Sequence, residues 1–423
     1  MADTVEIDGS LGEGGGQILR TSLALAMITG RGLRMRKIRA GRAKPGLRRQ
    51  HLACVEAAAR LCHGEVRGAT LGSQELELVP GEITGGELAL DIGTAGSTTL
   101  VVQTILVPAL AAGVALRAVI QGGTHNPLAP PFEFLERVYA PHLRTMGAGL
   151  TLTLDRHGFA AGGTGAPGRE PRSARNARTP PRERRPELHD DGVERTAPRH
   201  PLGAPRHDAG GAPEPAAERS AASVRRTSYD RSTPSDRDAA RGAAHGQLTL
   251  EVAAGSPLRP LELVTAGPII ARRATAILSR LPTHVAEREH AVVQRELGFA
   301  PVDCEVRVVD AGGVANVLLL EVERAGGCEL VSAFGEQGLR AERVAQRGCD
   351  ELAAFLAADV PVGEHLADQL LLPLAVAGAG RFRAAALSRH ATTNIETIRR
   401  FLDVEITVER DSDATLVTLD RAR

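Results

Sequence analysis

The chain has 423 residues, carries a formal net charge of zero and contains 2% aromatic residues, none of them tryptophan. This length predicts two or three domains. The balanced charge excludes a protein that attracts nucleic acid through an overall positive field. The scarcity of aromatic residues argues against one that reads single-stranded bases mainly by stacking. Any contact with phosphate groups must therefore come from local clusters of arginine.

The first residues and the cysteines indicate where the protein works. No basic stretch followed by an apolar stretch opens the chain, and no run approaches the roughly 18 apolar residues of a membrane span. Five cysteines are scattered without a Cys-x-x-Cys pair, which is typical of reduced thiols rather than of a disulfide framework or a zinc site. We predict a cytoplasmic protein.

In chain order, the dominant feature is a unit that occurs three times. Polar or glycine-containing turns at residues 12–20, 93–100 and 363–370 each open an apolar helix that ends at a glycine. After each helix come a strand, a second helix (47–61, 132–146 and 394–401) and an alternating pair of strands. The pattern predicts an α/β fold of the α+β type, with a body of three repeated β-α-β-α-β-β units and helices on one face of each sheet.

Two segments interrupt this body. Residues 164–246 are rich in Arg, Pro and Ser and have no hydrophobic period, which predicts a disordered insertion between strands at 150–154 and 247–252. Residues 267–359 predict a small inserted α/β domain, with helices at 285–297 and 340–356 and strands at 305–309, 317–323 and 330–333. The body then comprises 1–163 for repeats one and two, 247–266 for the rest of repeat two, and 360–423 for repeat three.

The role of the Arg/Pro-rich insertion stays open at this point. A spacer, a reading-frame artefact of GC-rich DNA and an arginine-rich RNA-binding segment all fit its composition. Its acidic residues and prolines dilute the basic charge, which favours the first two interpretations.

The first copy carries two groups of residues suited to phosphates. The sequence GEGGGQILR at 12–20 places glycines at the start of a helix, where backbone N–H groups and the helix dipole attract anions. Glu13 within it can hold a divalent cation. Residues 39–51 then gather cationic and imidazole side chains around a Pro-Gly turn, and arginine binds phosphate through paired donors. A tight turn and a solvated basic loop are the alternatives.

The third copy supplies a candidate nucleophile. His390 lies between a strand and a helix, where the second copy has its loop at 121–131 and the first copy has its basic loop. Equivalent loops of three equivalent units should lie close together, so His390 is a candidate for covalent catalysis. Asp368 and Gln369 open the preceding helix, where an acid can also serve merely as a helix-terminal charge.

These motifs, in this order, resemble those of the RNA 3'-terminal phosphate cyclase family. The matching stretches are GEGGGQILR, IRAGRAKPGLRRQHL, GTAGSTTLVVQT, GGTHNPLAPP, THVAERE, GEHLADQL and RHATTNIETIRRFL. The resemblance covers nearly all of the chain except about 164–246, and the fold that it implies agrees with the threefold body and the small inserted domain.

The resemblance implies a role for each matching position. His390 matches the adenylated nucleophile, and Glu13 matches a metal-associated acid. Residues around ATP or the adenylate are matched by Gln103, Pro130, His365, Leu366, Ala367, Asp368 and Gln369. The group that handles phosphates of ATP or of the RNA end is matched by Arg20, Arg39, Arg42, Lys44, Arg48, Gln50 and His51.

The activity implied is the ATP-dependent conversion of an RNA 3'-phosphate to a 2',3'-cyclic phosphate. It proceeds through a covalent histidine-AMP and an RNA-(3')pp(5')A intermediate, with Mg²⁺ or Mn²⁺ as the metal and RNA 3'-phosphate ends as the partner. No membrane and no obligate protein partner are expected. Two alternatives remain: a non-catalytic cyclase-like factor of ribosome biogenesis, and an enolpyruvyl transferase of similar architecture.

Overall fold

A computed structural model describes residues 3–12, 15–159, 245–255, 257–411 and 414–422 of the chain. The insertion predicted at 164–246 therefore lies outside the described residues up to position 244. The strands on either side of it pair with each other in antiparallel fashion. This pairing confirms that the two alternating segments are neighbours in one sheet.

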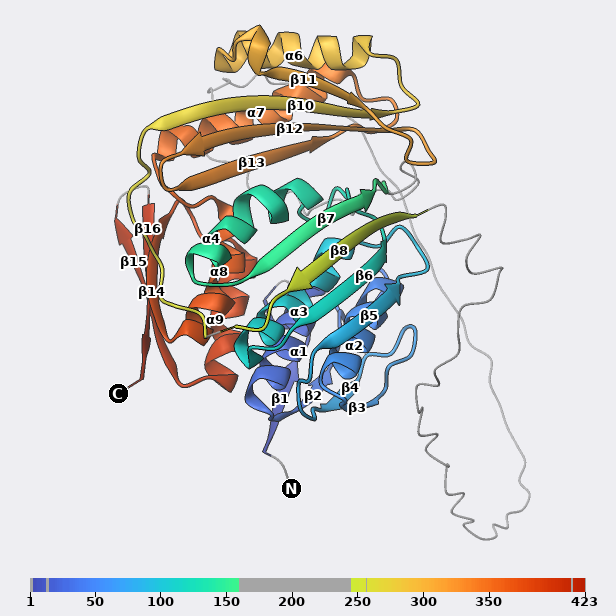
Figure 1. Cartoon of the computed structure of the whole chain (residues 1–423), viewed down its shortest axis with the longest axis vertical. Helices are drawn as coiled ribbons and strands as arrows, with labels where there is room; N and C mark the ends of the chain where they lie inside the picture. Colours follow the sequence, from blue (N-terminus) through green and yellow to red (C-terminus); the bar gives the residue numbers. More distant parts are fainter. Residues whose placement is uncertain (1–2, 13–14, 160–244, 256, 412–413, 423) are drawn as a thin grey trace, which may run out of the picture. The chain divides into compact units, whose positions relative to one another are not determined.

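The body contains three four-stranded sheets with the same strand order (Figure 1). Counted along the chain, the first strand of each sheet pairs with the second in parallel. The fourth strand lies between the second and the third and is antiparallel to both. The strands are β1 (Thr4–Asp8), β2 (Gly32–Arg36), β3 (Glu65–Arg67) and β4 (Leu76–Val79) in the first copy, β5 (Gly86–Asp91), β6 (Leu116–Gly122), β7 (Leu150–Arg156) and β8 (Gly246–Val252) in the second, and β9 (Glu262–Leu263), β14 (Ala379–Ala384), β15 (Val404–Asp411) and β16 (Ala414–Arg421) in the third.

The short strand β9 marks a difference from the expected boundaries. Residues 247–266 were assigned to the second repeat, but β9 pairs in parallel with β14 of the third sheet. The third copy therefore begins before the inserted domain and continues after it. With two residues and no clear alternation, β9 leaves too short a pattern to assign from sequence.

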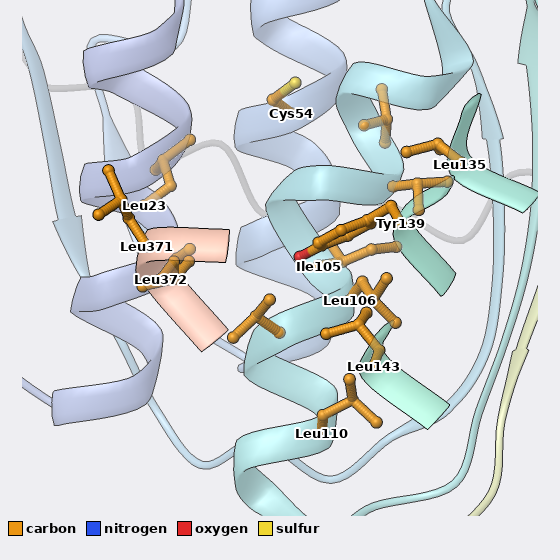
Figure 2. Packing of buried hydrophobic residues seen from close by; sticks show 14 of the residues in the cluster. Leu23, Cys54, Ile105, Leu106, Leu110, Leu135, Tyr139, Leu143, Leu371 and Leu372 are labelled. Carbon is orange, nitrogen blue, oxygen red and sulfur yellow. The ribbon is translucent and has the colours of Figure 1, made fainter. Parts of the chain in front are cut away.

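The helices of the three copies pack against one another and share one hydrophobic core with the inner faces of the sheets. They are α1 (Gln17–Thr29) and α2 (Arg49–Leu61) in the first copy, α3 (Thr98–Ala112), the π-helical turn η1 (Phe134–Tyr139) and α4 (Ala140–Thr145) in the second, and α8 (Glu364–Ala377) and α9 (Arg389–Phe401) in the third. Figure 2 shows leucines and Ile105 of this core converging around α3, with Tyr139 entering from η1 and Leu371 and Leu372 from α8.

The first helix of each copy ends in the same way. Gly30, Gly113 and Gly378 stand directly after α1, α3 and α8, and each has a positive φ, of 69°, 65° and 78°. Glycine adopts this left-handed conformation at no steric cost, so it closes a helix and lets the chain turn into the next strand. The repeat seen in the sequence is thus a repeat of backbone geometry.

The inserted domain has its own four-stranded sheet and a separate small core. Its elements are β10 (Ile269–Ser279), α6 (His284–Leu297), the short 3₁₀ helix η2 (Pro301–Asp303), β11 (Cys304–Val308), β12 (Ala315–Arg324), β13 (Gly327–Phe334) and α7 (Ala341–Ala358). The strand order is β11-β10-β12-β13, and α6 and α7 cover one face (Figure 1). The sequence did not predict β10, whose first five residues are exposed and include an Arg-Arg pair. None of the described helices is long and apolar enough to cross a membrane.

Candidate functional site

Asp368 lies where helices of the first and third copies meet. The side-chain amide of Gln17, on α1, donates to Asp368 Oδ2. The amide of Asn394, on α9, donates to Oδ1. The Thr21 hydroxyl in turn donates to Asn394 Oδ1 at 2.6 Å, which fixes the orientation of that amide. Three helices are therefore joined through one carboxyl group whose two oxygens both accept hydrogen bonds from neutral amides.

The electrostatic surroundings of Asp368 connect it to His390. Burial raises the pKa of the Asp368 carboxyl, and the Gln17 hydrogen bond and the charges of His390 and Arg20 oppose that rise. His390 is thus within electrostatic range of the carboxyl. It is the second residue of α9, two positions after the N-cap Ser388, whose hydroxyl accepts the Ala391 N–H at 3.0 Å. Its ring is half-buried, so it is neither sealed in the core nor fully in solvent.

A cavity beside Asp368 draws residues from all three copies. We call it the mixed cavity, because acidic, basic, amide, hydroxyl and apolar side chains line it. Its lining residues are Gln17, Arg20, Thr21, Gln103, Val107, Tyr139, Asp368, Gln369, Leu372 and Asn394.

Two side chains of the mixed cavity, those of Gln369 and Tyr139, have a polar group that a ligand could hydrogen-bond. Within the described part of the chain, the buried oxygen Oε1 of Gln369 has no hydrogen-bond partner. Such an atom costs stability unless something binds it. Burial and the nearby charge of Asp368 raise the pKa of the Tyr139 phenol, so its hydroxyl stays protonated and can donate. The cavity is therefore prepared to accept a ligand that has both N–H donors and acceptors.

A second cavity, of about 420 Å³, is lined mainly by basic and amide side chains. We call it the basic cavity. The residues that line it are Arg39, Arg48, Arg49, Gln50, His51, Leu71 and Thr94. None of these is acidic, which leaves the positive charge uncompensated among them. Guanidinium groups gathered in this way bind phosphate or another polyanion.

His51 stands in this basic environment as a neutral ring. Burial, followed by the charges of Arg20, Arg39 and Arg48, lowers its pKa to about 3. The Arg48 backbone N–H donates to Nδ1 at 3.0 Å, so the single proton of the neutral ring must be on Nε2. A Cβ added at Gly16 would lie 2.4 Å from that Nε2. The Nε2–H donor thus lies against the glycine turn that begins α1.

Gly16 lies close to one lining residue of each cavity, His51 of the basic cavity and Arg20 of the mixed cavity. It precedes Gln17 of the mixed cavity, and a side chain at this position would also lie 3.0 Å from an Arg20 guanidinium nitrogen. Only glycine leaves this space free at the start of α1, where backbone N–H groups and the helix dipole favour an anion. A phosphate held here would meet Arg20 on one side and His51 on the other.

Several predicted residues lie outside both linings. Arg42 and Lys44 are exposed on the loop before α2. The Arg39 guanidinium donates to the carbonyl oxygens of Lys44 and Gly46, at 2.8 and 2.9 Å, so it also holds that loop in shape. Glu13, the predicted metal ligand, lies outside the described residues.

The remaining predicted nucleotide residues do not line the mixed cavity. The carbonyl of Pro130 accepts the Thr99 hydroxyl at 2.8 Å, at the start of α3. Leu366 and Ala367 are buried on α8 and directly precede Asp368 and Gln369. His365 is exposed, with its ring edge-on to Phe134 at 6.5 Å. His390 is not part of the lining either and is connected to it through Asp368.

The sequence analysis missed part of the site. Gln17 and Asn394 sit inside motifs that were singled out, but a lone amide has no pattern that marks it. Tyr139 lies on a helix with no motif, and its place in the mixed cavity follows only from the packing of η1 against α8. Arg49 belongs to the basic run predicted at 39–51, but the sequence assigned it no role of its own.

Comparison with known proteins identifies the family. The sequence model described as "RNA 3'-terminal phosphate cyclase" matches residues 11–408. The chain belongs to the RNA 3'-terminal phosphate cyclase family. Proteins named RNA 3'-terminal phosphate cyclase are 39% identical in Ectopseudomonas mendocina (98% of this chain, 97% of the relative) and 36% identical in Koribacter versatilis (99% and 96%). A third, from Salmonella typhimurium, is 37% identical over 99% of both chains.

Membership in the cyclase family makes the chain an enzyme of the ligase class and implies the use of ATP. Both cavities lie within the matched region, and the relatives span the chain from end to end.

Proposed function

We propose that this chain uses ATP to close an RNA 3'-phosphate into a 2',3'-cyclic phosphate, with His390 as the residue that carries AMP. The observation that supports this most directly is the position of His390. It stands at the start of α9, within electrostatic range of Asp368, and Asp368 lines a cavity to which all three copies contribute.

Polar groups of the mixed cavity, a space of about 40 Å³, suit parts of a nucleotide. The unpartnered Oε1 of Gln369 suits an N–H donor such as the amino group of adenine. The space at Gly16 and the start of α1 suit a phosphate, with the Arg20 guanidinium beside it. The basic cavity then provides charge for the remaining phosphates or for the RNA end.

In the first step, a ring nitrogen of neutral His390 attacks the α-phosphorus of ATP. A P–N bond forms, the bond to the bridging oxygen breaks, and pyrophosphate leaves with the electron pair. Negative charge on the phosphoryl oxygens grows during this step. Arg20 and the Nε2–H of His51 are positioned to offset it at the glycine turn, which is how fixed donors lower such a barrier.

In the second step, an oxygen of the RNA 3'-phosphate attacks the same phosphorus, and His390 leaves as a neutral ring once it is protonated. The product is an RNA-(3')pp(5')A bridge. In the third step, the neighbouring 2'-hydroxyl attacks the RNA phosphorus, loses its proton and expels AMP. The need for a 2'-hydroxyl accounts for a preference for RNA over DNA.

The family resemblance also implies Mg²⁺ or Mn²⁺ near the phosphates. A divalent ion bound there would neutralise phosphate charge. The residue expected to hold it is Glu13, and the steps above rely on the side chains that the structure describes.

Trapping the labelled intermediate tests the proposal. The full-length protein is incubated with ATP labelled at the α-phosphate and a divalent cation, then denatured in alkali and in acid. We expect a label on the wild type that withstands alkali and is lost in acid, as a phosphoramidate requires, and no label on His390→Ala. A wild type that never acquires label would defeat the proposal and favour a non-catalytic cyclase-like factor or an enolpyruvyl transferase.

A 3'-phosphorylated oligoribonucleotide completes the test. With ATP, its end should become resistant to phosphatase, and the matching oligodeoxyribonucleotide should stay sensitive because it has no 2'-hydroxyl. A labelled protein that leaves the RNA end sensitive would retain the adenylation step and refute the cyclisation.

A further inference from the structure

Three side chains capable of binding a metal gather away from both cavities. His125 and Glu133 stand near the two ends of the loop between β6 and η1, and His157 follows β7. Their ligand atoms all lie within 4.8 Å of one another. The side chains of His125 and Glu133 are 0% and 3% exposed, and His157 is half-buried. Two histidines and one glutamate form a donor set that zinc uses in proteins.

The hydrogen bonds around His125 are those of an oriented ligand. Its Nδ1 lies 2.8 Å from the Thr124 hydroxyl, and its Nε2 lies 2.8 Å from Glu133 Oε2. The same hydroxyl accepts the Gly158 N–H at 2.9 Å and lies 3.3 Å from the Gly158 carbonyl. Thr124 can therefore accept from Nδ1–H while it donates to that carbonyl. The Thr124 hydroxyl thus fixes the ring through Nδ1, as outer hydrogen bonds do at metal sites, and a bound ion would take the place of the proton between Nε2 and Glu133 Oε2.

Metal binding at this cluster requires a carboxylate at Glu133 and an unprotonated ligating nitrogen on each imidazole. An ion that bound there would therefore release the proton that joins His125 Nε2 to Glu133 Oε2.

Two arginines near the cluster form ion pairs with carboxylates other than Glu133. Arg137 forms an ion pair with Glu321, and Arg307 pairs with Glu305 at 2.7 Å. On the other side, Phe159 stacks on His125, with ring centroids 4.8 Å apart. The cluster therefore has an apolar wall, and these two arginines form their ion pairs with carboxylates outside it.

We propose that His125, Glu133 and His157 bind one divalent transition-metal ion of the zinc type. The ion would tie both ends of the loop that carries Pro130 to the end of β7. Three protein ligands leave a position for water. This site is not the one expected to involve Glu13. The proposal does not depend on whether His390 carries AMP.

Cobalt titration of the full-length protein tests the proposal. The protein is stripped with a chelator and titrated with Co²⁺ in the absence of ATP. We expect one equivalent to bind with the visible absorption of four- or five-coordinate cobalt, and Zn²⁺ to displace it. Zn²⁺ should also raise the melting temperature, because it binds the folded state.

Three variants locate the ion. His157→Gln should bind Co²⁺ at least about tenfold more weakly, since even loss of an outer partner costs that much. His284→Gln, which changes an exposed histidine at the start of α6, and Glu13→Ala should both bind like the wild type. The melting temperature of each stripped variant reports whether it is folded.

Two results would overturn the site. One is a wild-type protein that shows only the weak visible absorption of six-coordinate Co²⁺. This measurement requires no variant. The other is a folded His157→Gln protein with unchanged affinity. Either would leave the cluster as a hydrogen-bonded His–Glu pair.

Discussion

The mixed cavity and the basic cavity each have one lining residue next to Gly16, yet they are built in opposite ways. The mixed cavity takes residues from all three copies, and its single carboxyl group is bound by amides of two other helices. The basic cavity comes mainly from the loop before α2 and the start of that helix, with no acidic residue in its lining.

The difference indicates that the two cavities have separate roles. A site that combines an acid, amides and a phenol can select a nucleoside and orient a nucleophile. A site of guanidinium groups can bind phosphates but can hardly tell one polyanion from another. We infer that the mixed cavity, together with His51, governs adenylation of the protein and that the arginines of the basic cavity govern use of the RNA end. The predictions below test this division.

The largest effect is expected from His390→Ala. Loss of the nucleophile should lower cyclisation from ATP by about a thousandfold or more. RNA that already carries AMP on its 3'-phosphate bypasses this residue, so the variant should still cyclise it. Phosphatase resistance of the two substrates measures both. If the variant cyclises neither substrate, His390 is also needed after the RNA end has been adenylated.

Asp368→Asn tests the mixed cavity itself. The amide cannot accept the same two hydrogen bonds, so Gln17 and Asn394 should shift, and a small misplacement can cost about a hundredfold in rate. We expect that loss in the rate of self-labelling with AMP. Asp403→Asn, which changes an exposed aspartate between α9 and β15, is the matched control and should label at the normal rate. Equal rates in the two variants would remove Asp368 from the site.

Arg49→Ala tests the basic cavity. Removing one charged phosphate contact should raise KM for the RNA by about tenfold. It should also weaken the dependence of that KM on salt, while self-labelling stays normal. Arg400→Ala, which removes an exposed arginine near the end of α9, should leave the KM unchanged. A loss of self-labelling in Arg49→Ala would contradict the division between the cavities.

Glu329 connects the mixed cavity to the inserted domain. This buried residue of β13 accepts the backbone N–H of Gly363, the N-cap of α8, at 3.1 Å. Burial raises the pKa of its carboxyl from 4.5 to about 8. The folded protein therefore holds a proton that the unfolded chain releases, so the free energy of unfolding should fall as pH rises from about 4.5 to about 8.

Glu329→Gln should remove that dependence, which is on the order of a few kcal/mol. Urea unfolding at about pH 5 and about pH 8 measures it. Glu323→Gln, at an exposed position of β12, should keep the slope of the wild type. If Glu329→Gln shows the same slope as the wild type, other groups cause the pH dependence.

The smallest effect is expected from deletion of residues 164–244. Gly158 and Gly246 already approach each other, since a Cβ on Gly158 would lie 2.4 Å from the Gly246 nitrogen. A short link can therefore join β7 to β8, and closing a shorter loop changes stability by roughly 1 kcal/mol. We expect cyclisation within about twofold of the wild type. A large loss confined to RNA affinity would instead assign the insertion to RNA binding.

The sequence predicted the repeated unit well, because helical and alternating periods recur with the same spacing around closing glycines. It could not predict β10, in which arginines interrupt the pattern, or the membership of β9, whose two residues carry no period. Long-range pairing, such as that of β9 with β14, is set by packing and leaves no local mark.

For the site, the sequence identified residues whose chemistry is explicit, such as Arg48, His51 and Asp368. It failed where a common side chain becomes functional through its neighbours. Tyr139 is an ordinary helix residue until η1 places it beside α8, and Asn394 matters because Thr21 fixes its amide. These roles arise from contacts across repeats.

The placement of β9 shows where the inserted domain could be removed from such an enzyme. In the second copy, residues 92–97 are enough to lead from the first strand to the first helix. In the third, an entire domain occupies that same connection, between β9 and α8. Joining these two elements with a turn of that length would yield a minimal protein of three equal modules, in which the contribution of the extra domain to RNA selection could be measured by subtraction.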